Sequence, residues 1–173
     1  MKHVWVLRHA KAAPGEPGGD DRSRPLTARG HRQGAALRAR LPELAASERP
    51  LPTLVLCSTA RRARQTAEEV LDGLGPGTRI ELEPLLYTAD AGAVVERLRL
   101  VPDEVVSVMV VGHNPTLHEL CFDLVAAEDE VSRRRLDDGF PTAALAVVGI
   151  DAPVWAELVA GAGHLEELVV PER

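Results

Sequence analysis

Cysteine is scarce in this chain, and long hydrophobic runs are missing from it. The two cysteines, Cys57 and Cys121, are too few for a disulfide framework, and their apolar neighbours predict buried, reduced thiols. No stretch is long enough to cross a bilayer. The apolar run within residues 1–10 is too short for a secretory signal, and no small-residue cleavage site follows it. We therefore expect a cytoplasmic protein.

An excess of basic residues is also absent. The formal net charge is −6 at pH 7, which argues against generic binding to nucleic acid or to an anionic membrane. If the protein binds a phosphate group, a few locally concentrated cations must hold it. The sequence contains no metal-ligand pattern and no Walker-type loop, so we expect neither a metal ion nor another cofactor.

The remaining composition is that of a globular protein. The chain has 173 residues, of which 45% are hydrophobic and 27% charged, and we expect a single domain over 1–173. Short apolar segments alternate with helix-like segments, which predicts an α/β three-layer sandwich with a mainly parallel sheet and an antiparallel edge. The predicted strands are His3–Leu7, Thr53–Ser58, 79–84, Glu104–Gly112, 142–150 and 154–161. The predicted helices are 25–44, 60–75, Ala91–Leu100 and 115–126.

Several local signals refine this scheme. Thr27 is a plausible N-cap, Gly73 and Gly75 are expected to stop the second helix, and Pro115 is expected in the first turn of the last one. The segment Pro14–Arg24 is rich in Gly, Pro and Asp and predicts a mobile surface loop. Two further segments receive no functional assignment: the run Arg133–Arg135, expected to be a solvated surface neutralised by the preceding acids, and the tail His164–Arg173.

Three predicted strands end in residues that are costly to bury. The first strand runs into Arg8-His9, the second into "STARRARQT", and the most hydrophobic one into "GHNPT", which places His113 at its tip. In parallel α/β sheets, ligands bind beyond the carboxyl ends of the strands. If these strands are neighbours, two histidines and at least two arginines meet at one point.

Such a group of side chains suits a phosphoryl group. Arginine offers a planar fork of donors that matches phosphate oxygens and keeps its charge. The helix start at Asn114–Thr116 adds unpaired N–H groups. Nearby arginines lower the pKa of a histidine, which keeps its ring neutral and able to attack phosphorus. A second histidine that donates to an oxygen would stabilise the transition state.

The three blocks "LRHAKA", "STARRARQTA" and "VGHNP" resemble the signature blocks of the histidine phosphatase superfamily, which has the phosphoglycerate mutase-like fold. The resemblance covers roughly residues 1–150. The short chain and "RSRPLTARG" resemble the small phosphohistidine phosphatases of the SixA type in particular.

The resemblance implies roles for four residues, and two more residues are candidates. His9 matches the phosphorylated nucleophile, Arg8 and Arg62 match the two phosphate-binding arginines, and His113 matches the second catalytic histidine. Arg24, in "RPLT", and Asn114 are further candidate phosphate-binding residues. Arg61 and Arg64 flank Arg62 and are expected to face solvent.

The chain departs from the family pattern at two positions. The glycine that normally follows the nucleophile is Ala10. The glutamate that serves most members as general acid is missing: the matching position is Tyr87, with Asp90 three residues later. An alkyl phosphate needs such an acid, whose loss costs roughly 10²–10⁴ in rate. An imidazole leaves without one, since the pKa of its protonated form is about 6.5. Asp90 could still act as a donor.

The sequence therefore predicts a phosphohistidine phosphatase that hydrolyses phosphohistidine on a protein through a covalent phosphohistidine intermediate. The expected partner is a phosphorylated protein of the phosphorelay type, or else a small phosphorylated substrate, with no nucleic acid and no membrane. One alternative is a broad-specificity phosphatase of small phosphate esters, and another is a non-catalytic phosphate-binding module. A cysteine-dependent phosphatase would need Cys-x5-Arg, but the residue six positions after Cys57 is Ala63.

Overall fold

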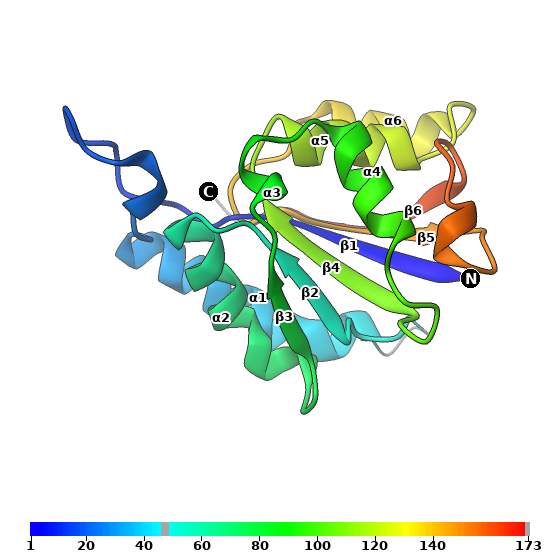
Figure 1. The fold of residues 1–173 in the computed structure, drawn as a ribbon, viewed down its shortest axis with the longest axis horizontal. Coiled ribbons are helices and arrows are strands. Elements are labelled where there is room, and N and C mark those ends of the chain that lie inside the picture. The colour runs from blue at the N-terminus through cyan, green and yellow to red at the C-terminus, as the bar shows by residue number, and fades with distance from the viewer. Residues whose placement is uncertain (46–48, 172–173) are drawn as a thin grey trace.

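The computed structural model describes residues 1–45 and 49–171, so 46–48 and 172–173 of the predicted domain lie outside the described residues. The described chain forms a six-stranded sheet with the order β3-β2-β4-β1-β5-β6 (Figure 1). Strands β3, β2, β4 and β1 are parallel, whereas β5 and β6 are antiparallel to their neighbours. The strands span Lys2–Arg8 (β1), Leu54–Cys57 (β2), Arg79–Leu82 (β3), Ser107–Gly112 (β4), Leu145–Ile150 (β5) and Gly163–Val169 (β6).

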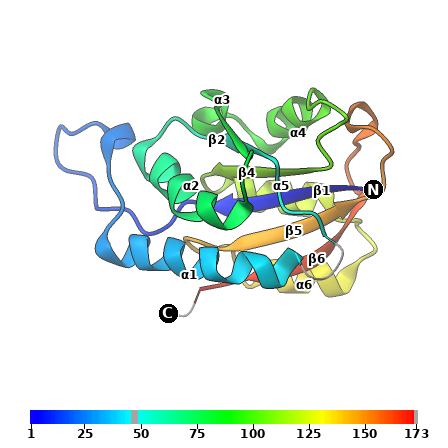
Figure 2. The same ribbon diagram turned by 90° about the horizontal axis from the view of Figure 1, so that it is seen from below.

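Helices cover both faces of the sheet, which confirms the predicted three-layer α/β architecture. Helices α1 (Ala28–Ala45) and α2 (Arg61–Leu74) lie on one face (Figures 1 and 2). The opposite side carries α3 (Leu85–Thr88), α4 (Ala91–Arg99), α5 (Thr116–Leu124) and α6 (Glu130–Asp137) (Figure 1). Two short 3₁₀ turns, η1 (Asp21–Ser23) and η2 (Trp155–Glu157), complete the order of elements. No helix of the described chain is both long and apolar enough to cross a membrane.

The continuous apolar character of the central strands follows from their burial on both faces. In β1, Val4 and Val6 belong to the core under α4 and α5, while Trp5 and Leu7 belong to the core under α1 and α2. Successive strand side chains point to opposite faces, so a strand covered on both sides is apolar at every position.

Helix boundaries follow the predicted signals with two corrections. Pro115 is the N-cap residue that precedes α5 and not part of its first turn. The Thr27 hydroxyl accepts the Gly30 amide at 3.1 Å, which confirms Thr27 as the N-cap of α1. Gly75 ends α2 with a φ of +96°. Gly73 does not stop the helix, since α2 continues to Leu74. A side chain at this position would be too close to α1, because a Cβ would come within 2.9 Å of the Arg38 carbonyl oxygen. Gly73 is therefore a close-packing position between the two helices.

The C-terminal strand prediction was wrong in position. Residues 154–161 do not form a strand but contain the η2 turn. The Trp155 ring is fully buried in the core, and its indole N–H donates to the Val105 carbonyl at 2.7 Å. The last strand is β6, in the tail that received no assignment. The sequence did not predict this strand because it lacks a continuous apolar run. As an edge strand, β6 alternates between buried residues such as Leu165 and exposed residues such as His164.

Candidate active site

His9 and His113 follow two neighbouring strands at the same height. Strands β1 and β4 are parallel and pair Arg8 with Gly112, so the next residue of each strand is a histidine. The two ring centroids are 5.2 Å apart, at an interplanar angle of 56°. The structure thus brings together two side chains that are more than a hundred positions apart in sequence.

The His9 ring is held with one nitrogen free. Its Nδ1 is 2.8 Å from the carbonyl oxygen of Ala10, and because a carbonyl only accepts, Nδ1 carries the proton and Nε2 the lone pair. Burial lowers the pKa of His9 to about 4, an effect that the hydrogen bond to Ala10 opposes. The positive charges of Arg62, Arg8 and Arg24 lower it further. At neutral pH the ring is therefore uncharged, as a nitrogen nucleophile must be.

His113 is anchored by a residue that the sequence did not single out. Its Nε2 is 2.8 Å from the hydroxyl of Ser58, the first residue after β2. Burial lowers the pKa of His113 to about 3, and the positive charge of Arg62 acts in the same direction. The Nδ1 atom is buried and has no hydrogen-bond partner in the described chain. Of the two ring nitrogens, Nε2 is therefore hydrogen-bonded to Ser58, whereas Nδ1 forms no hydrogen bond within the described residues.

Arg62 lies at the start of α2 and is 95% buried, although it carries a full charge. Its guanidinium donates to the Asp21 backbone carbonyl at 2.8 Å and to the Asp21 carboxylate at 3.1 Å. The carboxylate also accepts the Tyr87 hydroxyl at 2.5 Å, and the Tyr87 ring stands edge-on to His113 with centroids 5.6 Å apart. The Tyr87 hydrogen bond, followed by Arg62, lowers the pKa of Asp21 to about 2.

Asp21 belongs to the segment predicted as a mobile surface loop. The segment projects from the carboxyl edge of the sheet, and an isolated bridge between Ala12 and Leu26 closes its base (Figure 1). Arg24 donates to the second Asp21 oxygen at 2.9 Å and to the Ala13 carbonyl at 3.0 Å. Arg24 therefore reaches the site as a neighbour of Asp21, and its charge acts on His9 from the rim.

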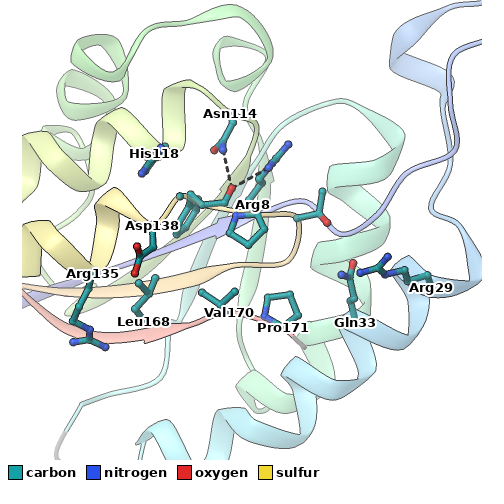
Figure 3. A pocket seen from close by; sticks show the side chains of 14 residues that line it. Arg8, Arg29, Gln33, Asn114, His118, Arg135, Asp138, Leu168, Val170 and Pro171 are labelled. Carbon is teal, nitrogen blue, oxygen red and sulfur yellow. Dashed lines mark hydrogen bonds between the residues drawn. The ribbon is translucent and has the colours of Figure 1, made fainter. Parts of the chain in front are cut away.

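Arg8 and Asn114, which directly precede and follow the two histidines in sequence, share one backbone acceptor. Both side chains donate to the carbonyl of Phe140, at 2.9 and 2.7 Å respectively (Figure 3). The Arg8 Nε is buried without a partner in the described chain, which leaves donor capacity for a ligand. Both residues line a cavity of about 920 Å³ that His9 and His113 do not line. Arg8 therefore lines this cavity while its charge also acts on both histidines.

Two residues of the "RARQT" block tie α2 to the loop after β1. The Thr66 hydroxyl accepts the Ala10 amide at 2.9 Å and donates to the Arg62 carbonyl at 2.7 Å. Gln65 accepts the Leu26 amide at 2.8 Å. Ala10 is fully buried, so the methyl group that replaces the usual glycine hydrogen is accommodated. The spacing of the block places its arginine in the site and its threonine against the backbone next to His9.

The remaining candidates form no hydrogen bond or ring contact with His9 or His113 within the described residues. Arg61 and Arg64 are exposed, as expected. Asp90 caps α4 by accepting the Ala93 amide at 2.9 Å. Burial raises the pKa of the Cys57 thiol to about 12, which makes it a poor nucleophile. No group of three or more potential metal-ligating side chains occurs in residues 1–45 and 49–171.

Comparisons with known proteins agree with this architecture. The model of the histidine phosphatase superfamily (branch 1) matches residues 4–100. An uncharacterized protein of Mycobacterium tuberculosis is 37% identical over 171 residues, covering 95% of this chain and 99% of that protein. An uncharacterized Mycobacterium leprae protein is 30% identical over 173 residues, with the same coverage.

Solved structures extend the similarity over nearly the whole chain. A protein of Agrobacterium tumefaciens, provisionally named phosphohistidine phosphatase SixA, is similar with a TM-score of 0.78 and 31% identity, over 98% of both chains. A protein histidine phosphatase SixA in complex with tungstate is similar with a TM-score of 0.72 and 30% identity, over 96% of this chain and 95% of that one. A provisionally named SixA of Nakamurella multipartitia reaches a TM-score of 0.82 at 27% identity, over 98% and 96% of the two chains.

Proposed function

Because the chain belongs to the histidine phosphatase superfamily, we propose that it is a phosphohistidine phosphatase that acts on a phosphorylated protein. His9 is the nucleophile in this proposal, and Arg8, Arg62 and His113 bind the phosphoryl oxygens. Arg24 and Asn114 contribute at the rim. The similarity to proteins named as SixA supports this substrate class.

The observation that carries the proposal is the state of the His9 ring. It is neutral at pH 7, its Nδ1 proton is donated to the Ala10 carbonyl, and its Nε2 lone pair has no hydrogen-bond partner among the described residues. Nε2 attacks phosphorus, and the bond between phosphorus and the substrate nitrogen breaks. The substrate ring, which already carries a proton on its other nitrogen, takes the electron pair and leaves as neutral imidazole. Water then attacks the phosphorus bound to His9, releasing inorganic phosphate and restoring the neutral ring. Catalysis then depends on positioning and on neutralising the equatorial oxygens.

The surroundings of His113 favour a substrate with a good leaving group. Tyr87 holds the position of the usual acid, and its hydroxyl is already donated to Asp21. Asp21 has a pKa of about 2 and is ionised at neutral pH, so it has no proton to give. Asp90 is occupied as a helix cap. An imidazole needs no such donor, whereas an alkoxide does.

Covalent labelling of a His9→Ala variant tests the proposal. The wild-type protein, incubated with ³²P-labelled phosphoramidate, should carry an acid-labile label and release phosphate from a phosphohistidine peptide. The variant should show neither activity above background. His164→Ala is the matched control, because His164 is half exposed on β6, and it should keep both activities. Full turnover by the His9→Ala variant would refute the mechanism.

A further inference from the structure

A second cavity continues the one beside Arg8. The first, of about 920 Å³, includes Arg8, Asn114 and Phe140, and the second, of about 600 Å³, lies along α1. Both are lined by Arg29, Gln33, Val170 and Pro171, so together they form one groove. Figure 3 shows the first of the two cavities, with these four residues among those that line it. We call it the α1 groove. It leads from the arginine next to His9 along α1 and past the end of β6.

The α1 groove is strongly positive in a chain whose net charge is −6. One acidic residue, Asp138, is found among its described lining residues. Its arginines are Arg8, Arg29, Arg32, Arg40 and Arg135. Apart from Arg8, these arginines are exposed and form no ion pair or side-chain hydrogen bond within the described part of the chain. Arg135 thus departs from the prediction that the run 133–135 is neutralised by its own acids.

The positions of the arginines on α1 reduce the stability of that helix. Arg29, Arg32 and Arg40 follow one another at spacings that place them on the same face. Like charges three residues apart destabilise a helix, and cations near its first turn face the positive end of its dipole. The first turn of α1 contains no acidic residue that would offset this. The intramolecular contacts of the described chain therefore give these charges no stabilising role.

The extent of the charge indicates the size of the ligand. Arg29 and Arg40 are eleven residues apart, which corresponds to roughly 16 Å along the helix. A single phosphoryl group cannot span that distance, whereas a row of acidic side chains on another protein can. The apolar residues Leu168, Val170 and Pro171 add a surface for the body of a polypeptide.

We propose that the α1 groove binds an acidic segment of the phosphorylated protein whose phosphohistidine reaches His9. This inference rests on the proposed function. Arg8 links the two regions, because it lines the groove and its charge also acts on His9. Charge complementarity of this kind speeds association and selects among partners.

Two phosphohistidine peptides of equal length, one flanked by glutamates and one by lysines, provide the test. Wild type should favour the acidic peptide in kcat/KM by about tenfold at low salt, and 0.5 M NaCl should remove the preference. Arg32→Glu/Arg40→Glu should remove or reverse it. Arg64→Glu/Arg79→Glu makes the same change in net charge at exposed arginines outside the groove and should retain it. Phosphoramidate, which has no flanking chain, should be hydrolysed equally by all three proteins.

Each other outcome has a defined meaning. Equal kcat/KM for both peptides in the wild type, or an unchanged preference in Arg32→Glu/Arg40→Glu, would overturn the groove proposal and leave the proposed function intact. Failure of the wild type to hydrolyse phosphoramidate and both peptides would instead overturn the proposed function. A wild-type dimer by light scattering that Arg32→Glu/Arg40→Glu converts to a monomer would assign the groove to a second copy and refute the acidic-substrate proposal.

Discussion

The carboxylate of Asp21 lies 3.1 Å from the guanidinium of Arg62, forty-one positions further along the chain. The same arginine also donates to the Asp21 backbone carbonyl at 2.8 Å. A predicted phosphate-binding cation is thus bound to an anion from the 14–24 segment. A phosphoryl oxygen that binds Arg62 has to compete with this carboxylate.

Substituting Asp21 by Asn should strengthen the binding of inorganic phosphate. The substitution removes the negative charge from Arg62 while keeping a hydrogen-bond acceptor for Tyr87. A half-exposed ion pair contributes up to about 1 kcal/mol, so we expect the inhibition constant of orthophosphate to fall about two- to fivefold. Glu16→Gln, in the same segment but outside these contacts, should leave it unchanged. Weaker phosphate binding by Asp21→Asn would show that Asp21 positions Arg62 rather than competing for it.

The titration of the two histidines should be displaced far into the acid range. The pKa of His9 is about 4 and that of His113 about 3, so neither ring should gain a proton as the pH falls from 8 to 5. In ¹H–¹⁵N NMR spectra, their ring nitrogens should keep the shifts of neutral imidazole over this range. A midpoint above pH 6 for either ring would contradict this picture of the site.

The same shifts predict how stability depends on pH. Between the unfolded pKa of about 6.5 and the folded values, the unfolded chain binds more protons than the folded one. The contribution of these histidines is therefore fully present above pH 6.5 and declines as the pH falls toward 4. Urea unfolding should show a lower free energy at pH 5 than at pH 7, and the difference should shrink in a His113→Asn variant. An equal difference in that variant would rule out His113 as a source.

Ser58→Ala should reduce kcat with little change in KM. The substitution leaves His113 without its 2.8 Å partner, and the loss of one such hydrogen bond, worth about 1 kcal/mol, corresponds to roughly a fivefold slower reaction. Ser107→Ala is the matched control, because the Ser107 hydroxyl is also buried but has no partner in the described structure. Equal losses of kcat in both variants would indicate a general packing effect rather than positioning of His113.

Asp90→Asn should leave turnover of both a phosphohistidine peptide and an alkyl phosphate within twofold of wild type. Asparagine caps helices as well as aspartate, so α4 should be preserved. Asp129→Asn is the corresponding control, since Asp129 caps α6 in the same way. A loss confined to the alkyl phosphate, of roughly 10²–10⁴, would identify Asp90 as a general acid and favour phosphate esters as substrates.

Local features of the sequence were enough to predict the central part of the fold. Continuous apolar runs identified β1, β2 and β4, because strands buried on both faces need apolar residues at every position. The carboxyl ends of parallel strands share one edge, so placing Arg8-His9 and His113 directly after such runs predicted that the histidines would lie close together. The family blocks added the expected roles of these residues, which the proposed variants test.

The tertiary structure decided what depends on packing between distant segments. The contact of Asp21 with Arg62 and Tyr87 requires the projecting segment to fold back over the sheet edge, and no local pattern encodes that return. The sequence around Trp155 predicts a strand. In the structure this residue is instead held by a buried hydrogen bond from its indole N–H to the Val105 carbonyl. The arginines of the α1 groove look like an ordinary solvated helix face until β6 is placed beside them. The periodicity of apolar residues indicates which face of a helix or strand is buried. Which distant segment packs against that face is determined only by the packing of the whole chain.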